Sequence, residues 1–156
     1  MARRSERTVI ARNRKAFHDY FIEETFEAGI ELTGTEVRSL RENGCQLKDC
    51  FVLVKKREAW LYNVHIAPYS HGNRANVDPD RRRRLLLHRR QIDYLARKTA
   101  ERGFSIVPTS MYFNDRGLAK VEIALARGKK LYDKREAIAK KDAKRDMARE
   151  LKARQR

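Results

Sequence analysis

The chain has 156 residues, of which 41% are hydrophobic and 37% are charged. Its 37 Lys and Arg outnumber 21 Asp and Glu, and the formal net charge is +16. The length favours one domain, and a charge this far from neutral favours a polyanionic partner such as nucleic acid. Since the sequence has no apolar run approaching the roughly 20 residues of a membrane span and no signal-peptide core, we expect a cytoplasmic protein.

The first third of the chain predicts two strands and a short helix. Residues 16–24 have a mixed pattern typical of a strand covered partly on both faces, and residues 26–32 alternate between apolar and polar side chains. A polar link between them predicts a hairpin. Thr35 is a suitable N-cap for a helix over residues 36–42, which Gly44 would end.

The middle of the chain predicts a second hairpin, a loop and a longer helix. Residues 51–55 and 60–66 flank a charged turn, and residues 67–79 are rich in turn formers. A helix fits residues 89–102, because its apolar residues form one stripe and Gly103 follows as a C-terminal stop.

A third hairpin and the fold class follow from the last strands. Residues 104–113 and 118–125 flank a turn, and Pro108 indicates an edge or a bulge. Six short strands with helices between the hairpins favour closure, which removes unpaired edges. We predict a mainly β fold: a six-stranded antiparallel barrel like the oligonucleotide-binding (OB) barrel over residues 13–127, a basic arm over 1–12 and a basic tail over 128–156.

The sequence contains no pattern typical of an enzyme. The four histidines fall in separate predicted elements, outside any metal-protease, phosphate-loop or nucleophile-elbow motif. Cys45 and Cys50 have no second Cys/His pair at zinc spacing, so reduced, mostly buried thiols are favoured over metal binding. We therefore expect neither a catalytic residue nor a cofactor.

Two basic segments are candidates for RNA binding. Asn13, Arg14 and Lys15 supply donors for phosphate oxygens just before His18 and Tyr20, whose rings could stack on unpaired bases. The alternative is a basic arm beside two core-packed rings. The run of four arginines, Arg81, Arg82, Arg83 and Arg84, is either a clamp on an RNA backbone or a solvated face.

The tail differs in composition from the rest of the chain. Residues 128–156 carry twelve Lys and Arg against five Asp and Glu. Four small or apolar residues at four-residue spacing form a stripe too narrow to offset the ordering entropy, so we expect a tail that is disordered when free and helical on a partner. A permanently docked amphipathic helix is the alternative.

Five sequence blocks, in order, resemble the SmpB family and cover nearly the whole chain. They occupy residues 13–23, 27–41, 65–69, 78–87 and 128–135. The resemblance implies a six-stranded OB-like barrel and a partner, the tRNA-like domain of transfer-messenger RNA (SsrA RNA). It also implies delivery with elongation factor Tu to stalled ribosomes, which trans-translation rescues. We expect a monomer.

The resemblance also implies roles for particular residues. Asn13, Glu27 and Leu86 match family positions implicated in RNA binding, and His18 and Tyr20 match an aromatic face near loop bases. The tail is similar to a segment that enters the empty messenger channel and probes the decoding centre of 16S ribosomal RNA. Tyr132 stands where a ring can stack on a decoding-centre base and where some members have His. The tail candidates are Lys129, Lys130, Tyr132, Asp133, Lys134 and Arg135.

Composition alone is also compatible with two other functions. A ribosomal or RNA-chaperone barrel with little RNA selectivity would have the same charge, and only the five blocks argue against it. A basic membrane-surface protein would need a broader apolar face than the tail stripe provides.

Overall fold

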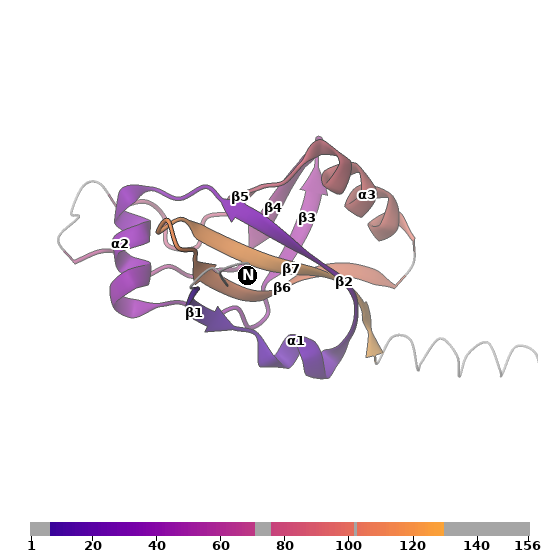
Figure 1. Ribbon diagram of the computed structural model, residues 1–156, viewed down its shortest axis with the longest axis horizontal. Helices are drawn as coiled ribbons and strands as arrows, with labels where there is room; N and C mark the ends of the chain where they lie inside the picture. The colour runs from indigo at the N-terminus through magenta and orange to yellow at the C-terminus, as the bar shows by residue number, and fades with distance from the viewer. Residues whose placement is uncertain (1–6, 71–75, 102, 130–156) are drawn as a thin grey trace, which may run out of the picture.

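The computed structural model describes residues 7–70, 76–101 and 103–129 (Figure 1). Within them the chain forms seven strands and three helices, which confirms the predicted mainly β class with inserted helices. The elements are β1 (Thr8–Arg12), α1 (Arg14–Asp19), β2 (Tyr20–Ile30), α2 (Gly34–Asn43), β3 (Phe51–Lys55), β4 (Glu58–Tyr62), β5 (Arg83–Leu86), α3 (Arg89–Ala100), β6 (Phe104–Phe113) and β7 (Ala119–Gly128).

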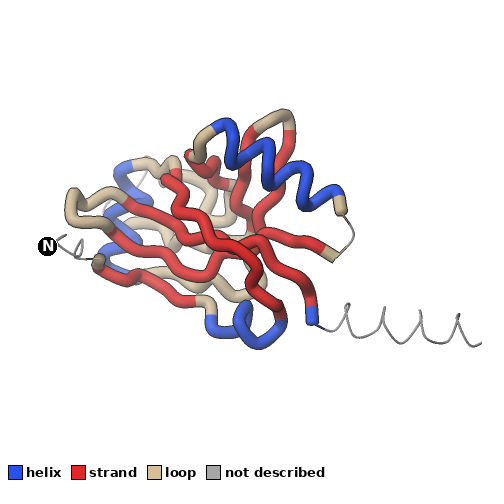
Figure 2. The backbone as a smooth tube through the Cα atoms, turned by 45° about the vertical axis from the view of Figure 1, so that its right-hand side comes forward, coloured by secondary structure: helices blue, strands red, loops and turns tan. Residues whose placement is uncertain are grey.

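The strands form one antiparallel sheet in the order β1-β6-β3-β4-β5-β2-β7, in which β6 also pairs with β7. Six strands thereby form a closed ring of pairings, and β1 lies outside it along β6. The ring is uneven, because β7 pairs at nine positions with each of β2 and β6, whereas β3 and β6 share one pair, Val52 with Ile106. Figure 2 shows the helices lying around the outside of the strands.

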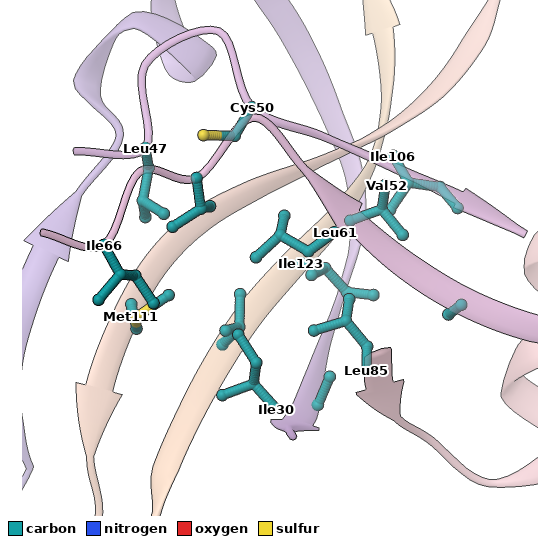
Figure 3. Close-up of a cluster of buried hydrophobic side chains, with 14 of the residues drawn as sticks. Ile30, Leu47, Cys50, Val52, Leu61, Ile66, Leu85, Ile106, Met111 and Ile123 are labelled. Atoms are coloured by element: carbon teal, nitrogen blue, oxygen red, sulfur yellow. The ribbon is translucent and has the colours of Figure 1, made fainter. Parts of the chain in front are cut away.

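The core lies among the strands of this ring. Inward side chains come from every ring strand and include Ile30, Leu61, Leu85 and Ile123, which Figure 3 shows gathered together. Burial of such side chains contributes roughly 25 cal/mol per Å² of apolar surface, so this cluster is the main source of stability. Cys50 belongs to the same cluster, in agreement with its predicted burial.

The first predicted hairpin is wrong. Residues 14–19 form helix α1, and β2 then runs without a turn from Tyr20 to Ile30. The helix begins because the Asn13 side chain accepts a hydrogen bond from the Ala16 backbone N–H at 3.2 Å, an N-cap that overrides a weak strand pattern. The polar link expected to break the strand instead pairs with β7, next to a bulge after Ile22.

The structure differs from the sequence prediction at four other places. The α2 N-cap is Thr33 rather than Thr35, because Thr33 and Glu36 form a reciprocal capping box. Strand β4 ends at Tyr62, earlier than predicted, and neither β1 nor β5 was predicted as a strand. The second and third hairpins and α3 are confirmed, as is a register shift after Pro108.

Among the described residues, no helix is long and apolar enough to cross a membrane. The predicted disorder and partner-induced helix of the tail concern residues 130–156, which lie outside the described ranges.

Candidate nucleic-acid interface

Asn13, a predicted RNA contact, is an interior residue. It is 5% exposed, and its amide nitrogen donates to the carbonyl oxygens of Pro108 at 2.8 Å and Leu47 at 3.2 Å. Its amide oxygen caps α1, and its backbone N–H donates to the Thr109 carbonyl. Asn13 therefore ties the start of α1 to β6 and to the segment before β3.

Helix α1 presents the neighbouring candidates on the surface. Arg14, Lys15 and His18 are exposed. A hydrogen bond and the charge of Asp49, 3.1 Å away, raise the pKa of Lys15 above its ordinary value. His18 lies on the helix beside Asp19, whereas Tyr20 begins β2 and is half-buried against the small cluster around Ala16. The two rings therefore do not lie on one face of a strand, where the strand predicted over residues 16–24 would have placed them.

Glu27 and Leu86 lie close together on β2 and β5. The Leu86 side chain, 52% exposed, covers Gly29 so closely that a Cβ there would lie 3.1 Å from the Leu86 Cβ. Glu27, Leu86, Arg84 and Lys120 all line one cavity of about 420 Å³. The structure thus brings together two candidates that the family resemblance supplied and one from the arginine run.

Glu27 is held in place by two residues that the sequence did not single out. The Tyr112 hydroxyl donates to the Glu27 carboxylate, whose other contact is the Arg7 guanidinium at 3.5 Å. Arg7 also lies over the Tyr112 ring at 4.5 Å. Burial and the hydrogen bond to Glu27 raise the pKa of Tyr112, so this hydroxyl remains a donor at neutral pH.

The arginine run is divided between the interior and the surface. Arg83 is completely buried and makes two contacts with Glu36 Oε2, from Nε at 2.9 Å and from Nη2 at 2.7 Å. It also donates to the carbonyl oxygens of Val64 and Pro79, and Arg81 donates to the other Glu36 oxygen. Arg83 therefore joins α2, β5 and the chain after β4, and it is not available to a phosphate.

The electrostatics of Glu36 follow from the same contacts. Burial by itself raises the pKa of this carboxyl, but hydrogen bonds from Arg81, the Thr33 backbone and Arg83 outweigh burial, so the pKa lies below its usual value. The carboxylate is thus charged at neutral pH and compensates the buried guanidinium.

Arg82, just before β5, and Arg84, within it, are both exposed. The Arg82 guanidinium stacks over the Trp60 ring at 4.1 Å, and Arg84 lies 3.4 Å from Glu58. Of the four arginines, only these two surface cations and the partly exposed Arg81 are therefore accessible to a partner.

A second cavity, of about 630 Å³, lies beside α1 and β1. Asn13 and Arg14 line it together with residues that were not predicted, among them Arg7, Arg12 and Phe17. The Phe17 side chain is 54% exposed. In the sequence, only its position inside the first block that resembles the family (residues 13–23) could have marked it as a candidate. Tyr112 gave no such signal, because its segment has the composition of a core strand.

The remaining candidates are the tail and the cysteines. The Lys129 ammonium donates to the Phe17 carbonyl oxygen at 3.3 Å and lies 5.2 Å from the Phe21 ring. The other tail candidates, residues 130 and 132–135, lie outside the described ranges. Cys45 and Cys50 are free thiols, and burial raises their pKa to about 11 and about 12. No metal-ligand cluster occurs in the part of the chain that the structure describes.

Exposed cations and rings around two surface cavities, on a β framework with a large positive charge, are typical of a nucleic-acid-binding protein. The sequence matches the family described as SmpB protein over residues 10–153. It is 54% identical to the SsrA-binding protein of Shouchella clausii over 156 residues, covering 100% of this chain and 99% of the relative. It is 58% identical to the SsrA-binding protein of Halothermothrix orenii, covering 95% of each chain.

A solved structure, described as "tmRNA-SmpB: a journey to the center of the bacterial ribosome", is also similar. The match has a TM-score of 0.60 and 46% identity, and it covers 80% of this chain and 84% of that chain. The chain belongs to the SmpB family. This is a family of RNA-binding proteins without a catalytic role.

Proposed function

We propose that the chain binds SsrA RNA, which is transfer-messenger RNA, and acts with it on the ribosome in trans-translation. The observation that carries this conclusion is the identity of 54% to an SsrA-binding protein along the full length of both chains. The similarity to a tmRNA–SmpB structure adds the bacterial ribosome as the setting. The protein acts as a monomer in the cytoplasm and reaches the stalled ribosome in a complex with elongation factor Tu.

The ring of six strands acts in this proposal as an OB-like barrel whose outer face holds the tRNA-like domain. Glu27, Leu86 and Arg84 form one part of the interface because they line one cavity. Arg14, Lys15 and His18 form another because they are exposed on α1. Tyr20 stands at the start of β2, half-buried beside them.

Asn13 and Arg83 support the interface indirectly. Asn13 fixes the start of α1, and Arg83 fixes the start of β5, between Arg82 and Arg84. Arg81 links the segment just before β5 to α2. The buried polar atoms of Asn13 and Arg83 already have partners within the protein, so these two residues contribute to RNA binding by holding exposed neighbours in position.

The tail reads the state of the decoding centre. Its positive charge draws it along 16S ribosomal RNA in the empty messenger channel, and Tyr132 stacks on one base, with Lys129, Lys130, Asp133, Lys134 and Arg135 beside it. We expect Tyr132→Ala to slow peptide transfer to charged SsrA RNA in a stalled-ribosome tagging assay while RNA binding off the ribosome stays normal. Tyr132→His should retain much of the activity, and normal tagging by the Ala variant would remove Tyr132 from the mechanism.

The decisive experiment for the RNA partner is competition between SsrA RNA and ordinary tRNA for the full chain at one fixed salt concentration. A clear preference for SsrA RNA is expected. Equal affinities would favour a general RNA-chaperone function instead. A chain ending at Arg127 should retain most of the affinity, since the proposed contacts lie before that point, and a loss above about 100-fold would make the tail a principal RNA anchor.

A further inference from the structure

The cavity of about 630 Å³ between β1, α1 and the outer side of β6 and β7 has features that a general basic surface does not explain. Its wall includes an exposed aromatic ring, Phe17, and a carboxylate, Glu122, while three arginines line it: Arg7, Arg12 and Arg14. The negative charge of this carboxylate would repel a phosphate placed next to it. A ligand that suits this cavity therefore combines an anionic backbone with a flat group that donates hydrogen bonds.

Phe17 supplies a stacking surface. Its side chain is 54% exposed although it borders the cavity, and it makes no aromatic or cation–π contact with another described residue. Val9, on β1, is also exposed and lines the same cavity. Two apolar side chains left facing one cavity favour a planar, weakly hydrated group such as a nucleobase.

Glu122 is oriented by a bulge in β6. The pairing of β6 with β7 shifts between Pro108 and Ser110, which leaves Thr109 as the extra residue. Neighbouring residues of a regular strand point to opposite faces, but at this bulge both hydroxyls lie within hydrogen-bond distance of Glu122 Oε2, Thr109 at 3.0 Å and Ser110 at 3.3 Å. The Thr109 hydroxyl shares its hydrogen with the Glu122 carbonyl oxygen at 3.1 Å. Because both bonds use Oε2, the Oε1 atom remains an acceptor for a ligand.

The three arginines of this cavity differ in the contacts that they make within the protein. Arg7 is occupied by Glu27 and the Tyr112 ring, whereas Arg12 and Arg14 are exposed and form no salt bridge with other described residues. These two cations at the cavity rim suit the phosphates on either side of an inserted base.

We propose that this cavity receives one unpaired guanine of the bound RNA, stacked on Phe17 with its Watson–Crick edge toward Glu122; this inference rests on the RNA-binding function proposed above. Guanine presents two adjacent donors, N1–H and the 2-amino group, to a carboxylate that can only accept. Adenine and cytosine each place a ring-nitrogen acceptor beside their amino group, and uracil places its one donor between two carbonyl oxygens. Oε1 has two lone pairs and can accept from both guanine donors, whereas each other base would place an acceptor against the carboxylate, so guanine is the base that this site favours.

The test is chemical footprinting of SsrA RNA bound to the full chain. Kethoxal modifies the N1 and 2-amino positions of unpaired guanine, while dimethyl sulfate reports unpaired adenine and cytosine and a carbodiimide reports uracil. We expect the wild-type protein to protect one unpaired guanine from kethoxal. Glu122→Gln should lose this protection, and Phe17→Ala should lose it together with about fivefold or more in affinity, in line with loss of one base–aromatic stack.

Leu118→Ala is the matched control, because Leu118 is 55% exposed and does not line the cavity. It should bind and protect as wild type does. Thermal melting of each variant separates a folding defect from a binding defect, and the exposed Phe17 provides a variant whose core is intact.

Two results would overturn the inference while leaving the RNA-binding function in place. One is SsrA RNA binding with no protected guanine, or with protection confined to adenine, cytosine or uracil. The other is an unchanged guanine footprint in both Phe17→Ala and Glu122→Gln. Failure of the proposed function is a different outcome, in which the wild-type chain shows no preference for SsrA RNA over tRNA.

Discussion

The segments around Asn13 and around Arg83 are far apart in the sequence, yet each is divided between the interior and the surface in the same way. In each, one polar side chain turns inward and hydrogen-bonds to carbonyl oxygens of other segments. Its neighbours, Arg14 and Lys15 in one case and Arg82 and Arg84 in the other, are exposed. They differ in chemistry, because the inward residue is a neutral amide in the first segment and a guanidinium paired with Glu36 in the second. A group of neighbouring residues that looks suited to RNA binding can thus include one buried residue that holds the exposed ones in place.

Arg83→Ala should give the largest effect on folding. Removing Arg83 takes away the fully buried partner of Glu36 and leaves the carboxylate with only the partly exposed Arg81, so we expect a loss of about 3–5 kcal/mol in the free energy of unfolding, measured by urea denaturation. Arg82→Ala, in the adjacent exposed position, should change it by less than about 0.5 kcal/mol. Equal losses in the two variants would contradict the division of this strand into an interior and a surface side.

Asn13→Ala should have the next largest effect. It removes the α1 cap and leaves the Pro108 and Leu47 carbonyl oxygens without this donor, so a loss of about 1–3 kcal/mol in the free energy of unfolding is expected. Arg14→Ala, one residue away, should weaken RNA binding with little change in stability. An Asn13→Ala protein of wild-type stability that bound RNA poorly would instead show that the amide contacts RNA directly.

Much of the fold, but less of the interface, follows from the sequence. The second and third hairpins and α3 could be predicted because their sequences have clear periodicity and strong turn or stop residues. Helix α1 has six residues and depends on one capping side chain, so its weak periodicity was taken for a strand. Strands β1 and β5 were not predicted, because each begins in or beside a run of basic residues that was interpreted only as a charged segment.

The burial of Arg83 could not be predicted from local sequence. Four consecutive arginines look equivalent, and what distinguishes Arg83 is Glu36, 47 residues earlier, brought close by the packing of α2. The same is true of the cavity around Phe17 and Glu122, which a bulge and two distant strands create. Tertiary contacts of this kind appear only once the register of the strands is known.

Replacing Arg82 and Arg84 together by Ala should have a moderate effect on RNA affinity and a clear effect on its salt dependence. Removing one arginine–phosphate ion pair should reduce the slope of log affinity against log salt by roughly 0.7 to 0.9, because fewer counterions are released. The measurement is a binding titration at several salt concentrations. Arg57→Ala, an exposed arginine in the β3–β4 turn, is the control, and a double variant with the wild-type slope would show that Arg82 and Arg84 only face solvent.

The smallest expected effect is on the pH dependence of stability. The pKa of Glu36 is lowered in the folded protein, so the unfolded chain binds the proton more readily. The stabilisation from this group is therefore fully present above the unfolded value of about 4.3 and is lost as the pH falls through the lower folded pKa. Urea denaturation between about pH 3 and neutral pH, a range that spans this window, should show a decline at the acid end that is shallower in Glu36→Gln. Arg81→Ala, which removes one donor to Glu36, should flatten the decline in part, whereas Arg82→Ala should leave it as in the wild type. Coincident curves for the wild type and Glu36→Gln would mean that the contacts of the buried carboxylate do not favour its charged form.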